Sequence, residues 1–312
     1  MDLSDLRTFL AVANAKGITS AGRELNTVQS NVTTRIKSLE SDIGLPLFTR
    51  HSRGMTLTEA GHRLLPFAER LLTLSREATA AAREDGVPRG QLSIGSMETT
   101  AAVRLPAVLA RYRRNCPHVK IRLLTGPTAD LIEAVIKGDI DAAFVAGPVD
   151  LPAVDAVSAF DEELVLITPR EMRSIDELRC SAADGLTALM FRIGCSYRQR
   201  LEQALADLGL QGYTRLELGT LDGILGCVAA GVGITVLPRS VVELSTHAEN
   251  LSIHLLPNNL RQVATLLIIR RDARRTVAVE RLRASVEKAE PVPPPLRTLR
   301  LVAGVPALGA EL

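Results

Sequence analysis

The chain has 312 residues, of which 46% are hydrophobic and 23% are charged. This length and composition predict a globular protein of two or three domains. No apolar stretch approaches the roughly 20 residues that cross a bilayer, and the N-terminus lacks the basic start and apolar run of a secretory signal. We therefore expect a soluble, cytoplasmic protein that makes no membrane contact.

The net charge of +2 is carried by the first 58 residues, which contain seven Lys and Arg side chains and five Asp and Glu side chains. The rest of the chain is electrically balanced. Any attraction to nucleic-acid phosphate is therefore expected from the N-terminal segment.

Three short helical patterns joined by tight turns begin the chain. The first has apolar residues at helical spacing and ends at Gly17. The second starts at Thr19 or Ser20, either of which can cap it, and Thr27 is expected to cap a third helix over residues 27–40. Two short helices joined by a tight turn predict a helix-turn-helix unit.

The third helix has Val32, Ile36 and Leu39 on one apolar stripe. Its opposite face is rich in short donors and acceptors and carries basic but no acidic side chains, which suits base edges and phosphates in a major groove. An ordinary solvated helix face has the same polar character, so this face alone does not separate the two interpretations. The residues that we expect to contact DNA, two of them from the hairpin that follows, are Thr27, Gln29, Ser30, Asn31, Thr33, Thr34, Arg35, Lys37, Arg50 and Arg53.

Two short extended runs around a basic tip with Gly54 predict a β-hairpin wing. From this tip Arg50 and Arg53 can reach phosphates or a minor groove. Thr58 is then expected to cap a long helix. The apolar stripe of that helix has no core of its own, so we expect it to pack against a second copy of the chain; packing on the chain's own C-terminal half is the alternative. Residues 84–90 contain Gly and Pro and mark a hinge.

From residue 91 onward, strand-like runs alternate with helical ones, which is typical of βα units and predicts a mostly parallel sheet. The predicted strands are residues 92–95, 119–124, 142–146, 164–168, 186–191, 216–219 and 234–237. The Pro-rich segment that ends the chain lies beyond the expected fold, and we expect an extended tail there.

Three stretches occur together in a specific order: DLRTFLAVANAKGITSAGRELNTVQSNVTTRIKSLESDIGLPLFTR at the start, then MTLTEAG, then GVGITVLPRS late in the chain. In this the chain resembles the LysR-type transcriptional regulators over nearly its whole length. The resemblance implies an α/β protein with an all-α-rich N-terminal part. Its expected parts are a winged helix-turn-helix domain at 1–58, a linker (dimerisation) helix and hinge at 59–87, a two-subdomain periplasmic-binding-protein-like (Rossmann-like) effector domain at 88–288, and a Pro-rich tail at 289–312.

The resemblance also implies partners: double-stranded operator DNA entered by the third helix, a small-molecule effector, further copies of the chain in dimers or tetramers, and RNA polymerase. Two departures from the family pattern stand out. Members often have Ser-Arg where this chain has Thr33 and Thr34, and its arginine follows one residue later at Arg35. Gly22 stands where the second helix usually has alanine, which costs roughly 1 kcal/mol of helix propensity.

In the family, effectors lie in a cleft between two subdomains. The resemblance places these at 91–161 plus 262–288 and at 162–261, with chain crossings near Asp161 and Gln262. Helix N-termini that meet at such a cleft offer free amides to anions or carbonyl oxygens, although the same turns also look like ordinary βα turns. The residues that we expect to contact the effector are Ser96, Glu98, Thr99, Thr100, Thr125, Phe144, Cys195 and Ser196.

The strings GSMETTAAVRLPAVLARY, FRIGCSYRQRLE and CVAAGVGITVLPRS resemble the branch of the family that contains a putrescine utilisation regulator. Glu98 would place an acid beside amide-rich helix entrances, which suits an amine or polyamine effector. The alternative is redox sensing through Cys195, because a thiol at a helix N-terminus has a lowered pKa. No resolving cysteine follows within residues 199–211.

Other classes of protein are disfavoured. The five histidines fall outside metal-ligand spacings, and no nucleophile elbow or phosphate loop is present. The four cysteines, Cys116, Cys180, Cys195 and Cys227, form no C-x-x-C pair, which argues against a disulfide framework or a zinc ribbon. We therefore expect no enzyme activity, no metal and no cofactor. A purely architectural DNA protein would not explain the large, electrically balanced second half.

Overall fold

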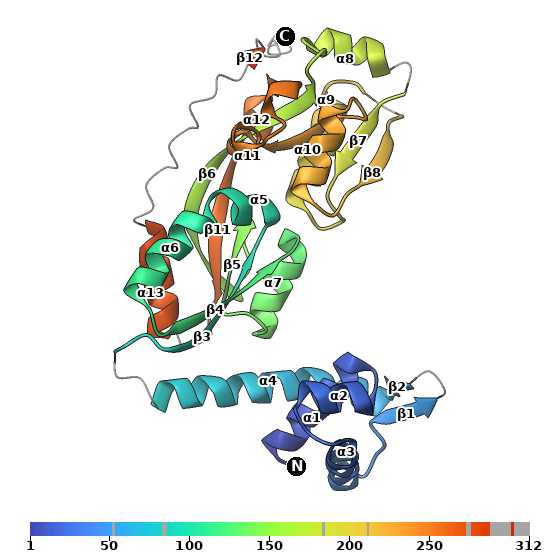
Figure 1. The fold of residues 1–312 in the computed structure, drawn as a ribbon, viewed down its shortest axis with the longest axis vertical. Coiled ribbons are helices and arrows are strands. Elements are labelled where there is room, and N and C mark those ends of the chain that lie inside the picture. Colours follow the sequence, from blue (N-terminus) through green and yellow to red (C-terminus); the bar gives the residue numbers. More distant parts are fainter. Residues whose placement is uncertain are drawn as a thin grey trace. The chain divides into compact units, whose positions relative to one another are not determined.

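The computed structural model describes residues 1–51, 54–82, 86–182, 185–210, 212–272, 276–287 and 301–302. The chain forms two compact units, the first chiefly from residues 1–86 and the second from most of the remainder. Figure 1 shows the elements of each unit.

The first unit consists of three short helices, a hairpin and a long helix. Their bounds are α1 (Leu3–Ala15), α2 (Ile18–Glu24), α3 (Gln29–Ile43), β1 (Phe48–His51), β2 (Gly54–Leu57) and α4 (Glu59–Ala82). Asp2 and Asp5 form a capping box at the start of α1, in which each carboxylate accepts from the other residue's backbone N–H. The rings of Phe9 and Phe48 pack 5.3 Å apart and join α1 to the hairpin. The apolar stripes of the three helices therefore meet in one small core.

Neither predicted cap of the second and third helices is formed. The N-cap of α2 is Gly17 and that of α3 is Val28, and neither makes a side-chain capping bond. Thr27 lies in the turn instead, where its backbone N–H donates to Gly22 O at 2.9 Å. This bond closes the turn one residue before the cap position, so the Thr27 hydroxyl accepts from Asn31 Nδ2 at 2.8 Å.

Gly22 departs from the family pattern at a point where two backbones meet. A Cβ atom at Gly22 would lie 3.0 Å from Thr27 O. Alanine would therefore require the turn to shift by a few tenths of an ångström. The gain in helix propensity from alanine, about 1 kcal/mol, is opposed by this close approach.

The start of α4 agrees with its sequence signal. The Thr58 hydroxyl accepts from Gly61 N at 3.1 Å, so the predicted cap is confirmed. A Cβ atom at Gly61 would lie 2.3 Å from Leu47 O. Glycine at this position therefore lets the long helix begin directly against the segment that precedes the hairpin.

The second unit is built on one curved sheet of order β12-β10-β6-β11-β5-β3-β4, with β9 paired to β6 and a separate pair β7–β8. The strands are β3 (Gly90–Ser96), β4 (Val119–Thr125), β5 (Ala142–Ala146), β6 (Val154–Pro169), β7 (Thr187–Met190), β8 (Thr214–Glu217), β9 (Thr235–Pro238), β10 (Leu251–Leu255), β11 (Gln262–Arg270) and β12 (Leu301–Val302). Strands β3, β4 and β5 are parallel, but β6 is antiparallel to β9, β10 and β11. The expectation of a mostly parallel sheet is therefore wrong for the central strands.

The antiparallel pairing follows from how the chain passes between two subdomains. β6 pairs with β11 as far as Glu163 opposite Gln262, and from Leu164 onward it pairs with β9 and β10. One long strand therefore belongs to both subdomains. β11 makes the return crossing in the opposite direction, so the two crossing strands run antiparallel.

Helices cover both faces of the first subdomain's sheet. α6 (Leu105–Asn115) and α13 (Val277–Glu287) lie on one face, where the Tyr112 hydroxyl donates to Ala278 O at 3.0 Å, and α7 (Thr128–Lys137) lies on the other (Figure 1). The short helix α5 (Glu98–Val103) follows β3. The helices of the second subdomain are α8 (Ile175–Ala182), α9 (Ser196–Asp207), α10 (Leu221–Ala229), α11 (Arg239–Leu244) and α12 (Asn258–Arg261).

Candidate functional site

The outer face of α3 presents polar side chains to solvent. Ser30, Asn31 and Lys37 are exposed, and Thr33 and Thr34 lie on the same turns. The hydroxyls of Thr33 and Thr34 donate to the carbonyls four residues earlier, each at 3.0 Å. Their oxygen lone pairs stay available as acceptors. This face therefore offers donors, acceptors and one lysine to a groove.

Arg35, the arginine displaced from the family position, is already engaged within the unit. Its Nη1 lies 3.2 Å from Asp5 Oδ1 and 3.9 Å from Asp2 Oδ1, both at the start of α1. The backbone N–H of Asp5 and the nearby Arg35 charge hold the pKa of Asp2 below its usual range. Lys37, by contrast, forms no ion pair with the part of the chain that the structure describes.

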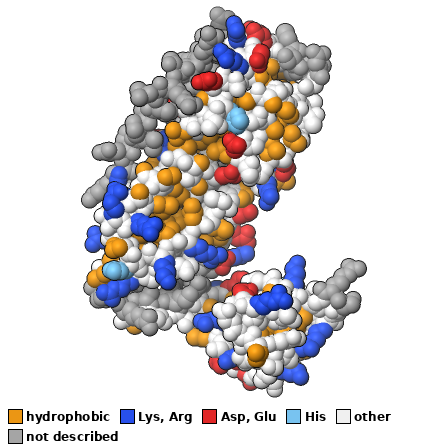
Figure 2. Space-filling view, in the orientation of Figure 1, with side chains coloured by type: hydrophobic (Ala, Val, Ile, Leu, Met, Phe, Trp, Pro, Cys, Tyr) orange, Lys and Arg blue, Asp and Glu red, His pale blue; other side chains and the backbone are white. Residues whose placement is uncertain are grey.

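The hairpin places Arg50 at an exposed position on β1, opposite Met55 on β2. Met55 N donates to Lys16 O at 3.0 Å, which ties the hairpin to the end of α1. A Cβ atom on Gly54 would lie 2.4 Å from the same carbonyl. Figure 2 shows Lys and Arg side chains on the surface of the first unit on the side of the hairpin. Arg53, expected to contact DNA, lies outside the described residues.

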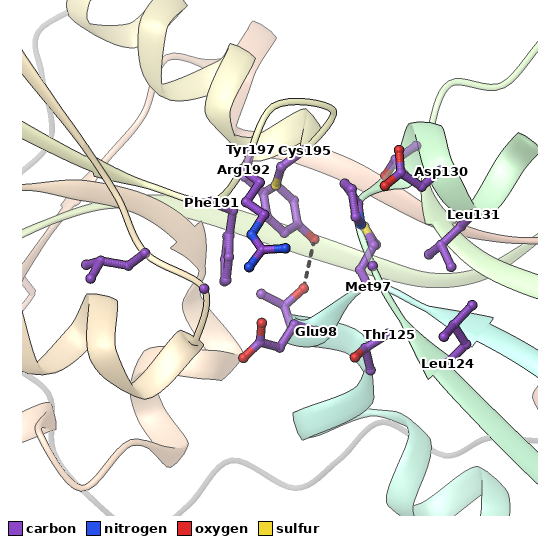
Figure 3. A pocket seen from close by; sticks show the side chains of 16 residues that line it. Met97, Glu98, Leu124, Thr125, Asp130, Leu131, Phe191, Arg192, Cys195 and Tyr197 are labelled. Atoms are coloured by element: carbon purple, nitrogen blue, oxygen red, sulfur yellow. Dashed lines mark hydrogen bonds between the residues drawn. The ribbon is translucent and has the colours of Figure 1, made fainter. Parts of the chain in front are cut away.

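A pocket of about 480 Å³ opens between the two subdomains of the second unit. Helix starts and strand ends of both subdomains supply its wall (Figure 3). The lining residues are Met97, Glu98, Thr99, Leu124, Thr125, Gly126, Pro127, Thr128, Asp130, Leu131, Phe191, Arg192, Cys195, Tyr197, Leu218 and Gly219. This volume lies within the roughly 300–1,000 Å³ of small-molecule sites.

Four of the eight residues expected to contact the effector line this pocket, namely Glu98, Thr99, Thr125 and Cys195. The other four do not. Ser96 and Thr100 are buried, and the Ser96 hydroxyl donates to Met97 O at 2.9 Å. Phe144 stacks on Phe160 in the core beneath α6. Ser196 has a buried hydroxyl oxygen without a hydrogen-bond partner among the described residues, but it is not part of the pocket wall.

Two polar contacts cross the pocket from α5 to the second subdomain. Glu98 Oε1 accepts from the backbone N–H of Leu221 at 2.8 Å, at the first turn of α10. Thr99 Oγ1 lies 3.5 Å from the Tyr197 hydroxyl on α9. A carboxylate is favoured at a helix N-terminus because it satisfies a free N–H and complements the helix dipole. The Glu98 carboxylate, which we expect to contact the effector, therefore also satisfies a free N–H at the start of α10 in the second subdomain.

Cys195 is the N-cap of α9, as a reactive thiol would require, but its electrostatic environment is wrong for one. Burial raises the pKa of the thiol, and the N–H groups of Tyr197 and Arg198 only partly oppose this. A thiol with a raised pKa carries little thiolate at neutral pH. The redox alternative therefore finds no support at this residue.

Sequence reasoning missed two charged members of the wall. Asp130 lies in the first turn of α7, shortly after β4 ends, and Arg192 follows the end of β7. Ligands of open α/β sheets lie at the carboxyl ends of strands. Charged residues within a few positions of each predicted strand end are the signal that would have found both.

Within the described ranges, no three His, Cys, Asp or Glu side chains come together in a way that could hold a metal ion. No described helix is both long and apolar enough to cross a membrane.

Two family patterns cover most of the chain. That of the bacterial regulatory helix-turn-helix protein of the lysR family matches residues 3–62, and that of the LysR substrate binding domain matches residues 85–290. The chain belongs to the LysR family of transcriptional regulators. It is accordingly a DNA-binding regulator with an effector-binding domain rather than an enzyme, and its α/β fold with a helix-turn-helix start agrees with the prediction.

Curated members of the LysR family are similar in sequence to this chain over nearly its whole length. The regulator GltR of Bacillus subtilis is 40% identical over 279 residues, covering 89% of this chain and 94% of GltR. YofA of Bacillus velezensis is 40% identical over 282 residues, covering 90% of this chain and 96% of YofA.

Solved LysR-family structures share the fold at low sequence identity. Full-length OxyR from Pseudomonas aeruginosa superposes with a TM-score of 0.67 at 20% identity, covering 92% of this chain and 95% of OxyR. CbnR in complex with its target DNA gives 0.67 at 23% identity, covering 92% of this chain and 99% of CbnR.

Proposed function

We propose that this LysR-family chain acts in the cytoplasm by inserting α3 into the major groove of an operator, with the β1–β2 hairpin on the flanking backbone. The observation that carries the proposal is the outer face of α3. There Lys37 is exposed and forms no ion pair with the described residues, and the hydroxyl oxygens of Thr33 and Thr34 can still accept hydrogen bonds, whereas Arg35 is paired with Asp5. Phosphate contacts fix the position of such a helix, and contacts with base edges select the sequence.

We propose further that α4 pairs with the same helix of a second copy. Phe67 and Leu74 are 59% and 60% exposed, and Leu71 between them is 38% exposed. Their spacing of four and three places all three on one helical stripe. Covering this stripe in a dimer removes apolar surface from water. Sedimentation tests whether these dimers assemble further into tetramers. RNA polymerase is the expected partner at the promoter.

The third part of the proposal concerns control. A small molecule that bears an amine occupies the pocket between the subdomains and changes DNA binding. Glu98 can bind an amine because only one of its carboxylate oxygens accepts from the Leu221 N–H, which leaves the other oxygen for an ammonium group. Asp130 adds a second acidic group to the pocket wall.

Footprinting on the DNA upstream of the chain's own gene tests this function. We expect a protected site that weakens steeply with salt, because phosphate contacts release counterions. Adding amines should change the extent or affinity of protection. An absent footprint, or one insensitive to salt, would contradict the DNA-binding mode. A footprint that no amine changes would contradict the control mechanism alone.

A further inference from the structure

The pocket between the subdomains has an unequal set of charges. Among its sixteen lining residues, Glu98 and Asp130 are acidic and Arg192 is basic. The remaining lining residues carry no formal charge. Charged groups that lose water on ligand binding need partners of opposite sign. The charges of the wall therefore favour a ligand that carries both positive and negative groups, with more positive charge than negative.

Arg192 is the charged residue of this wall that would have no oppositely charged partner if the ligand carried only amines. Its side chain is exposed, and it makes no ion pair or hydrogen bond with the described part of the chain. A Cβ atom on Gly219 would lie 3.8 Å from Arg192 Nη2, which is an ordinary contact, so the guanidinium lies beside the backbone of Gly219. A planar guanidinium that is exposed and unpaired can bind a carboxylate through two parallel hydrogen bonds.

The two acids occupy other parts of the wall. Figure 3 shows the Arg192 guanidinium directed toward the side of the pocket that holds Glu98, with Asp130 on the other side of the pocket. Glu98 retains one carboxylate oxygen after capping α10. Asp130 is exposed and has no ion-pair partner among the described residues. One acceptor group is therefore present for each of two separate ammonium groups.

We propose that the effector is a basic amino acid, a small molecule with one carboxylate and two amines. Its carboxylate binds Arg192, and its ammonium groups bind Asp130 and the free oxygen of Glu98. A diamine would leave Arg192 unpaired and add a second cation near it. A dicarboxylate would pair one carboxylate with Arg192 but place the other against Glu98 or Asp130. This inference rests on the proposed control by a ligand in the pocket and specifies its chemical class.

Calorimetric titration of the full-length protein with four matched compounds tests the inference. Ornithine has both amines and the carboxylate, putrescine lacks the carboxylate, norvaline lacks the side-chain amine, and glutarate has two carboxylates. Lysine extends the series by one methylene. We expect ornithine or lysine to bind at least about tenfold more tightly than putrescine, norvaline or glutarate, because a charge-assisted pair contributes that much.

Substitutions test whether the carboxylate of the ligand binds Arg192. Arg192→Gln should lower the affinity for the basic amino acid to that for putrescine and leave putrescine binding unchanged. Arg198→Gln is the matched control, because Arg198 lies nearby on α9 but pairs with Glu217 at 2.8 Å outside the pocket wall. It should leave every affinity unchanged. Thermal unfolding of both variants checks that the fold is retained.

Asp130→Asn should lower the affinity for the basic amino acid more than the affinity for norvaline. Putrescine binding as tightly as ornithine and lysine, a preference for glutarate, or no effect of Arg192→Gln would each overturn the inference. So would the absence of binding by all five compounds. In these cases a salt-dependent footprint that responds to another amine would leave the proposed function standing, whereas the loss of the footprint would remove the function itself.

Discussion

Arg104 and Glu162 form a two-point ion pair at the place where the chain passes between the subdomains, with N–O distances of 2.7 and 3.0 Å. The Ser240 hydroxyl on α11 donates to the same carboxylate at 3.0 Å. Arg104 directly follows α5, and Glu98 at the other end of α5 caps α10. One short helix is therefore bound to the second subdomain at both its ends, and its first turn also lines the pocket.

We expect Arg104→Gln to destabilise the second unit by about 3–5 kcal/mol, because it leaves the largely buried Glu162 carboxylate without its cation. Chemical unfolding measures this change. Arg271→Gln is the control, since Arg271 is 57% exposed where it pairs with Asp155 and should cost less than about 1 kcal/mol. Equal effects of the two variants would show that the Arg104 pair does not hold the subdomains together.

Lys37→Gln should weaken DNA binding on specific and unrelated sequences alike and lower the salt dependence by about 0.9 in the slope of log K against log salt. Arg35→Gln should change that slope less, because the Arg35 guanidinium is paired with Asp5. Fluorescence anisotropy over a range of salt concentrations gives both slopes. A larger change in slope for Arg35→Gln than for Lys37→Gln would reverse the assignment of the two cations.

We expect the folded protein to lose stability in mild acid because of the buried side chain of His254. It is 1% exposed, its Nε2 lies 2.9 Å from Thr168 Oγ1, and burial lowers its pKa below the usual value. A histidine with a lowered folded-state pKa stabilises the fold above its unfolded pKa of about 6.5. That contribution is lost as the pH falls below 6.5, by up to about 1.4 kcal/mol per pH unit.

Urea unfolding between pH 7.5 and pH 5 checks this effect. The His254→Gln variant should show a shallower fall in the free energy of unfolding than the unmodified protein. The exposed His118→Gln variant should keep the original pH dependence. Identical profiles for all three proteins would mean that His254 does not stay neutral in the folded protein.

Cys195 should react slowly with iodoacetamide at pH 7 and faster as the pH rises beyond 9, because burial raises the pKa of its thiol. Peptide mapping by mass spectrometry follows this residue separately from the other cysteines, and glutathione serves as the reference thiol. Peroxide treatment should leave the footprint unchanged in both the unmodified protein and Cys195→Ser. Faster alkylation than glutathione at pH 7 would contradict the raised pKa.

Local sequence patterns predicted the elements more reliably than their connections. The stripe of Val32, Ile36 and Leu39 correctly placed the core face of α3, and Thr58 correctly marked the start of α4. The direction of the central strands was missed, because pairing between β6 and β11 joins residues about a hundred positions apart. No local pattern carries that pairing.

The sequence by itself determined the helix-turn-helix, the wing, the family and the charge excess at the N-terminus, because each depends on spacing within a few dozen residues. Only the tertiary structure decided that Arg35 pairs with Asp5, while Lys37 has no ion-pair partner in the described ranges. It also decided that Arg192 and Asp130 share a pocket with Glu98. These relationships depend on distances between segments far apart in the chain, which side-chain packing and strand pairing set.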